Sequence, residues 1–422
     1  MTIKLQPTPT SGSTGNKVVR VDHGNVSGSL EDDKAFVQSE GTWTASIGRK
    51  GFSAGYLRAR NGPLLTSLGT PQTPSKVALS EARKVESHLS AVERFDLAFK
   101  HAKGVSGSLT ERYRVEGSRP HAQGWEGYCN RWALASLDPE VGPKLNEARV
   151  YQGVYFSIAD QRGLATFLGE QNLTFEDLEV QHPSVVDLQK AMVTFLQKDG
   201  SGFVADKFND EAERLRNPAQ MAINPTWHLQ VWNQPVHSVE QEVKLGTAGD
   251  IGEAMSTLGR DELPEGAKVY RVKTKLTYGS EAFENETDPD NKRMDNYEGP
   301  VEDKDLKLDY FLVVNTAGQV IDGTLAKTSD PLPDSLWVPG RGEKFKTPEG
   351  AFMRELINRG VSHAKVTSFE DAMARFLTIG KPVSAEQKET LRHEFVGLAN
   401  AYGPGELDER LKTLGLSAAD FK

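Results

Sequence analysis

The sequence contains a single cysteine, Cys129, in 422 residues, so no disulfide bond can form within the chain. So few thiols weakly indicate a reducing compartment. The sequence also lacks any run of about 18 apolar residues, the length that a membrane-spanning helix requires, so we expect no membrane span. Residues 1–7 lead into a polar stretch without the apolar segment of a secretory signal. We therefore expect a cytoplasmic protein, or one exported by a specialised secretion route.

An excess of basic residues is absent as well. Lys and Arg number 50 against 59 Asp and Glu, which gives a formal net charge of −9. A surface of this sign repels phosphate backbones, so we expect no nucleic-acid partner. Apolar residues make up 37% of the chain, which is enough to bury a sizeable core. The length suggests two or three domains, or one large domain with appendages.

The distribution of residue types divides the chain into three parts. Residues 1–35 are rich in Thr, Ser, Gly and Pro, which predicts a disordered tail. Residues 36–345 show helical patterns followed by late alternating strands, an order that favours an α+β fold. Residues 346–422 carry apolar residues at helical spacing, which predicts an α-helical C-terminal module.

Within these parts the periodicity predicts individual elements. Helices are expected at 75–102, 132–137, 160–168 and 185–196, and three more after residue 347, one of them with Ser368 as its cap. Strands are expected at 150–158, 227–231 and 269–277, with a hairpin at 310–321. The acidic stretch 281–307 is expected to be a solvent-exposed loop.

Cys129 lies where a loop meets an expected helix. Glycines and aromatic residues precede it, and the apolar run 132–137 follows it. A cysteine at a helix N-terminus feels the positive end of the backbone dipole, which lowers the thiol pKa and favours the thiolate. A thiolate can attack an amide carbonyl and form a thioester. The alternative is a buried free cysteine that packs as a small apolar side chain.

A nucleophilic thiolate needs a base, and the base needs a group that orients it. Among nine histidines our candidate base is His228, which lies 99 residues after Cys129 at a turn into an expected strand. His237 is its rival. Asp322, late in the expected hairpin, is the candidate that fixes the imidazole tautomer, or else it caps its own turn. Asn233 is a further candidate for the orienting group.

Gln123 stands six residues before Cys129. This spacing resembles the approach to the nucleophile in papain-like cysteine proteases, where the glutamine amide helps to hold the oxyanion. A side-chain N–H at that point stabilises negative charge that develops only in the transition state. The alternative is an ordinary loop glutamine.

The acidic stretch offers a weak case for a metal. The spacing of Asp288 and Asp290 matches the first two ligands of a calcium-binding loop. The glycine at the sharp turn and the terminal glutamate of an EF-hand, however, are misplaced. We therefore expect no metal site and no cofactor.

Several segments, in the same order along the chain, resemble the transglutaminase elicitor family. Residues 89–96 are similar to its Leu-Ser-x-x-Glu-Lys-Tyr-Asp segment, and residues 125–133 to its Trp-x-Gly-His-Cys-Asn-Gly-Trp-Ala nucleophile motif. The Val-Trp-Asn-Gln-Pro-Val stretch at 231–236 also matches. Tyr128 and Arg131 depart from the family's His and Gly beside the nucleophile. The resemblance implies, for residues 36–345, a papain/transglutaminase-like core in which the cysteine helix packs on an antiparallel sheet.

The resemblance also implies an activity, the transfer of protein-glutamine γ-glutamyl groups through a triad of Cys129, His228 and Asp322. The partners would be protein substrates that carry Gln and Lys. The residues expected to bind substrate or the oxyanion are Gln123, Trp125, Asn130, Trp132, Trp232 and Asn233. The tryptophans have the alternative of packing in the core. Two other functions stay open, a cysteine peptidase or amidase of the same fold and a non-catalytic binding or toxin-like module.

Overall fold

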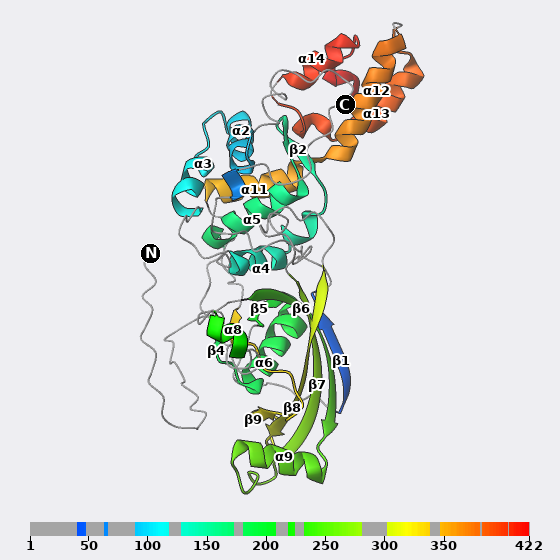
Figure 1. The fold of residues 1–422 in the computed structure, drawn as a ribbon. Helices are drawn as coiled ribbons and strands as arrows, with labels where there is room; N and C mark the ends of the chain where they lie inside the picture. Colours follow the sequence, from blue (N-terminus) through cyan, green and yellow to red (C-terminus); the bar gives the residue numbers. More distant parts are fainter. Residues whose placement is uncertain are drawn as a thin grey trace.

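The structure, a computed structural model, describes residues 40–47, 63–65, 89–117, 128–172, 180–207, 218–223, 232–280, 302–337, 347–379, 382–403 and 405–421. Within these ranges helices combine with antiparallel sheets, so the expected α+β class is confirmed. Figure 1 shows an elongated molecule with a large sheet at one end, a helical layer in the middle and the last helices of the chain at the other end.

The main sheet has eight strands in the part of the chain that the structure describes. The strands are β1 Gly41–Ser46, β4 Val180–Gln181, β5 Phe203–Asp206, β6 Asn233–Leu245, β7 Lys268–Gly279, β8 Asp303–Val314, β9 Val320–Leu325 and β10 Ser335–Trp337. Their order is β4-β10-β5-β6-β7-β8-β9, and β1 joins β6 off this path. β5 pairs with residues 233–236 of β6 and β1 with residues 238–243, so two short strands share one edge of β6.

Helices make up the rest of the regular structure, together with a small second sheet of β11 Val361–Ser362, β2 Arg149–Tyr151 and β3 Val154–Phe156. The α-helices are α2 Ala91–Lys103, α3 Leu109–Arg112, α4 Cys129–Leu137, α5 Ile158–Asn172, α6 Val185–Ala191, α8 Pro218–Ile223, α9 Ala248–Leu258, α11 Pro348–Arg359, α12 His363–Ile379, α13 Ala385–Phe395 and α14 Glu406–Thr413. Shorter 3-10 or π turns are η1 Pro63–Leu65, η2 Tyr113–Gly117, η3 Gly142–Lys144, η4 Met192–Asp199, η6 Leu398–Asn400 and η7 Ala418–Phe421.

The helix that begins at Cys129, α4, lies between the helical layer and the sheet, above the ends of β5 and β6 (Figure 1). Its end is dictated by Pro139, because the residue before a proline avoids the helical region; Asp138 is extended there, with φ −65° and ψ 122°. Trp132 and Leu134 are buried in the core. The helix also comes close to the sheet at Gly202, where an added Cβ would lie 2.8 Å from a methyl carbon of Leu137. Burial and this close approach fix where Cys129 is presented.

The hydrophobic core is divided unequally. The main core joins α2, α4, α5, the sheet and α11, whose Phe352 ring lies 5.0 Å from that of Phe95. A smaller core contains Val150, Tyr155 and the apolar side chains of the helices from Val361 onward. The sequence-derived boundary at residue 346 precedes α11, which packs in the main core, whereas the C-terminal residues that pack in the smaller core start at Val361.

Local patterns predicted several of the described elements, and four expectations are corrected. The strand expected at 150–158 is two short paired strands, β2 and β3, and α5 already begins at Ile158. The helix expected at 75–102 begins, in the described residues, only at Ala91, because Ser90 is extended and caps it. The expected loop 281–307 is wrong at its end, because β8 begins at Asp303 and pairs with β7 along its whole length. Ser368 does not cap a helix. It lies inside α12, and its hydroxyl donates to Glu394 Oε2 at 2.8 Å. The expected disordered tail, 1–35, lies outside the described residues.

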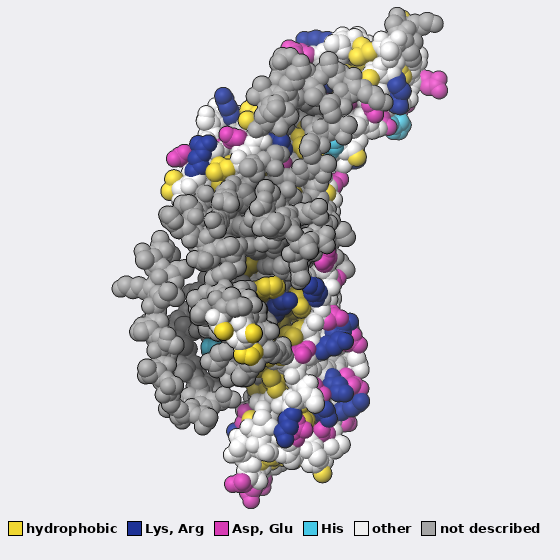
Figure 2. Space-filling view, in the orientation of Figure 1, with side chains coloured by type: hydrophobic (Ala, Val, Ile, Leu, Met, Phe, Trp, Pro, Cys, Tyr) yellow, Lys and Arg dark blue, Asp and Glu magenta, His cyan; other side chains and the backbone are white. Residues whose placement is uncertain are grey.

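The surface of the sheet carries charges of both signs. Figure 2 shows Lys, Arg, Asp and Glu side chains interspersed over this end of the molecule. Ion pairs among them include Lys244 with Glu242 and Lys275 with Asp305. Among the described residues, no helix has the length and apolar character needed to cross a membrane.

Candidate active site

Cys129 is the first residue of α4 and is partly exposed. Tyr128 precedes it at the N-cap position, and its side chain makes no capping hydrogen bond. The first backbone N–H groups of a helix have no intrahelical acceptor and carry partial positive charge. The sulfur therefore occupies the end of the helix at which a thiolate is stabilised, as the sequence predicted for a nucleophile.

Asn233, the first residue of β6, faces this sulfur. Its amide Nδ2 lies 3.6 Å from Cys129 Sγ, a distance at which the N–H donates to sulfur. The side chain is 2% exposed, and its Oδ1 is buried without a hydrogen-bond partner in the described structure. The site thus contains one occupied donor and one unused acceptor beside the thiol.

Asp206 is an acidic residue at the same end of the sheet. It lies on β5 directly opposite Asn233 in the strand pairing, and it is 5% exposed. Its Oδ1 accepts the backbone N–H of Trp232 at 2.8 Å, and its backbone carbonyl accepts the N–H of Asp334 at 2.9 Å. These bonds hold a buried carboxylate one strand away from the residue that contacts the thiol.

Sequence reasoning missed Asp206. Its only local signal is a charged residue that ends the apolar stretch 203–205. Its position opposite Asn233 follows from pairing between β5 and β6, which no spacing in the sequence records.

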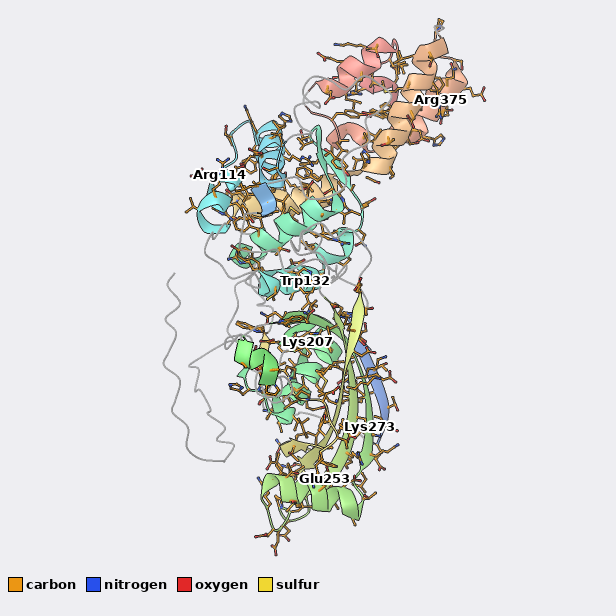
Figure 3. All side chains as sticks on the ribbon, viewed as in Figure 1. Arg114, Trp132, Lys207, Glu253, Lys273 and Arg375 are labelled. Carbon is orange, nitrogen blue, oxygen red and sulfur yellow. The ribbon has the colours of Figure 1, made fainter. Side chains whose placement is uncertain are left out.

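Trp232 lies beside Asn233 and packs against a lysine. The ammonium of Lys207 is 5.2 Å from the centre of the Trp232 ring and 5.4 Å from that of Tyr278. Figure 3 shows Lys207 where the sheet meets the helical layer, near Trp132. Burial raises the pKa of Tyr278, and the negative charge of Asp305 raises it further.

The remaining residues predicted to bind substrate or the oxyanion lie in different places, or outside the described residues. Trp132 is fully buried, so it packs in the core, the alternative that the sequence left open. Asn130 follows Cys129 within α4, and its side chain is not among those described. Gln123, Trp125 and His228 lie outside the described residues.

Asp322 is not brought to Cys129. It pairs with Val313 on β8, ten residues from Asp303 at the end of the sheet nearest Asn233, or roughly 33 Å along the strand. Its carboxylate forms an ion pair with Arg260, just beyond α9. Figure 1 shows α9 at the end of the sheet opposite α4. The hairpin was predicted correctly, but in the sheet Asp322 lies at the end opposite α4.

His237, the alternative candidate for the base, contacts a residue of β8. It follows Asn233 by four residues, or roughly 13 Å along β6. Its Nε2 lies 3.0 Å from Asp303 Oδ1, and the ring is buried. This side-chain contact ties β6 to the start of β8.

The described residues contain no group of three or more His, Cys, Asp or Glu side chains placed to hold a metal ion. Asp288 and Asp290, the weak calcium signal, lie outside these residues.

Comparison with known proteins gives one similar solved structure. No family model and no curated protein matches the sequence. The GP42 transglutaminase from Phytophthora sojae is similar in structure, with a TM-score of 0.51 and 17% sequence identity. The match covers 77% of this chain and 93% of that protein. At this identity the likeness concerns the fold, and the chain therefore has a transglutaminase-like fold.

Proposed function

We propose that this protein is a cysteine acyltransferase that moves the γ-glutamyl group of a protein glutamine onto a primary amine. The observation that carries the proposal is the contact between Cys129 and Asn233 at the N-terminus of α4. A thiol at this position is suited to nucleophilic attack. The transglutaminase-like fold supports the choice of acyl transfer.

In the first half-reaction the Cys129 thiolate attacks the side-chain carboxamide carbon of glutamine. The carbon–sulfur bond forms, the carbon–nitrogen bond breaks, and ammonia leaves with a proton from an imidazolium. His228 is the proposed imidazole, as the sequence predicts. In the second half-reaction a lysine amine attacks the thioester, its proton passes to the imidazole, and the thiolate returns. The proposed reaction needs no cofactor.

Asp206 is proposed as the acid that orients the imidazole, in place of Asp322. A buried carboxylate that accepts the ring N–H fixes the tautomer and stabilises the imidazolium. Its position opposite Asn233 supports this role.

The test uses the full chain, a glutamine-containing protein such as casein, and a fluorescent primary amine. We expect the amine to become covalently attached to the glutamine protein with release of ammonia. Cys129→Ala should lower this rate by at least roughly 10³-fold. Ammonia or peptide release that does not depend on added amine would assign a hydrolase instead, since water then resolves the thioester.

The nucleophile can be tested independently of any substrate. Alkylation of Cys129 by iodoacetamide should show a thiol that titrates below the free value of about 8.5. Titration near that value, together with no amine incorporation, would favour the non-catalytic module. Any activity of such a module would survive Cys129→Ala.

A further inference from the structure

We propose that Asn233 makes this site selective for a primary carboxamide, because its Oδ1 accepts a hydrogen bond from the nitrogen that leaves and then from the nitrogen that attacks. The inference rests on the proposed acyl transfer and adds a residue that determines which bond is cleaved. Two observations carry it: the buried acceptor of Asn233 that has no partner, and the direction of its amide donor.

The first observation is that a buried acceptor beside the nucleophile has no partner. Asn233 is 2% exposed, and no described group donates to its Oδ1. Buried polar atoms in folded proteins are almost always hydrogen-bonded, because an unsatisfied one keeps the full cost of its desolvation. A site that tolerates this cost beside a nucleophilic thiol is suited to a ligand that supplies the missing donor.

The second observation is the orientation of the amide. Nδ2 lies 3.6 Å from Cys129 Sγ, so the donor faces the sulfur, where it favours the thiolate. Because Oδ1 belongs to the same planar amide, roughly 2.2 Å from Nδ2, it lies no more than about 6 Å from Sγ. One carbon–sulfur bond, one carbon–nitrogen bond and one hydrogen bond span such a distance. A nitrogen on the carbon that is bonded to sulfur is therefore within reach of Oδ1.

The chemistry of the two half-reactions matches this acceptor. A glutamine carboxamide brings two N–H groups, and the attacking lysine amine brings its own. When the carbon–sulfur bond forms and the carbon–nitrogen bond breaks, one N–H can stay bonded to Oδ1 while the nitrogen takes the proton from the imidazolium. An ester of the same acyl group forms the same thioester but has an oxygen in place of the nitrogen. It offers Oδ1 no donor and brings a lone pair against it.

The experiment compares two acyl donors with the full chain and one fixed primary amine. One donor is an N-protected Gln-Gly dipeptide, and the other is the same dipeptide with a glutamate γ-methyl ester in place of the glutamine. Their kcat/KM values report acylation, and the ratio of amide to ester isolates the nitrogen. Two variants of similar shape are used: Asn233→Leu removes donor and acceptor, and Asn233→Asp keeps the acceptor while it removes the donor.

We expect Asn233→Leu to lower the amide-to-ester ratio by roughly 5- to 150-fold, which corresponds to about 1–3 kcal/mol. Asn233→Asp should slow both donors, because a carboxylate beside the sulfur disfavours the thiolate, but leave the ratio within about threefold of the original. Should the leucine variant not fold by circular dichroism, Asn233→Ala takes its place.

If Asn233→Leu lowers kcat/KM by the same factor for the amide and the ester substrate, the inference is overturned. Asn233 would then act only on the thiol. Failure of the proposed function looks different. In that case the unaltered protein would form no amide product from either donor, and the ratio that tests Asn233 would never be defined.

Discussion

The amide of Asn233 lies 3.6 Å from the sulfur of Cys129, although 104 residues separate them in the chain. One residue begins a helix and the other begins a strand, so two element ends meet at the site. The pairing of β5 with β6 places Asp206 directly opposite Asn233.

Two aspartates compete for the acidic role. Asp206→Asn should lower kcat/KM of amine incorporation by roughly 10²- to 10⁴-fold, because an amide no longer stabilises the imidazolium. The fold should persist, since asparagine keeps an oxygen that can accept the N–H of Trp232. The matched control is Asp322→Asn, which breaks only the ion pair with Arg260 and should leave kcat/KM within about twofold. If only Asp322→Asn lowered kcat/KM strongly, Asp322 and not Asp206 would be the acid of the triad.

Two histidines compete for the role of base. His228→Gln should reduce amine incorporation by roughly 10²-fold or more, because proton transfer to the leaving ammonia is lost. His237→Gln should change the rate little, since that ring is paired with Asp303 about 13 Å along the strand from Asn233. Steady-state rates at pH 7 measure both variants, and urea unfolding checks that each is folded. A rate loss confined to His237→Gln would exchange the two assignments.

The two cores should respond separately to truncation. Phe352→Ala opens a cavity against Phe95 and Phe99 and should destabilise the main core by about 3–5 kcal/mol. The temperature at which activity is lost should fall with it. Phe369→Ala removes a ring packed near Phe395 in the smaller core. It should lower the unfolding temperature of the C-terminal helices but leave the temperature at which activity is lost unchanged. If both temperatures fell together, the main core and the smaller core would unfold as one unit.

The cap of α2 gives a prediction for pH. Ser90 and Glu93 form a capping box, and the hydrogen bonds from the Ser90 backbone and hydroxyl lower the pKa of Glu93. A lowered carboxylate pKa stabilises the fold above the ordinary value near 4.5, and this stabilisation is lost as pH falls through the folded-state pKa. Ser90→Ala should therefore cost about 1 kcal/mol at pH 7 and less at acidic pH.

Urea unfolding of both proteins at pH 7 and at pH 3.5 measures this difference. The matched control is Ser384→Ala, because its box uses the uncharged Gln387 in place of a glutamate. The cost of that substitution should not change between the two pH values. A cost of Ser90→Ala that is equally independent of pH would remove Glu93 from the explanation.

Much of the fold was accessible from local patterns. The helix after Cys129 ends where Pro139 requires it, and the hairpin at 310–321 forms where alternation and the turn residues predict it. The start of β8 was missed because Asp303 and its neighbours are polar, and their place in the sheet comes from pairing with β7. Ser368 was misassigned because a serine that could cap a helix is also tolerated inside one when its hydroxyl finds Glu394.

The sequence by itself determined several elements and the position of the candidate nucleophile, because helix caps, proline and apolar periodicity act over a few residues. It placed Cys129 at a helix N-terminus and Asp322 in a hairpin, and both placements hold. Only the tertiary structure decided which amide contacts the sulfur and which acid lies opposite that amide. Strand order and register are set by hydrogen bonds between distant segments. They bring Asn233 to the thiol and Asp206 opposite Asn233, and they carry Asp322 to the other end of the sheet.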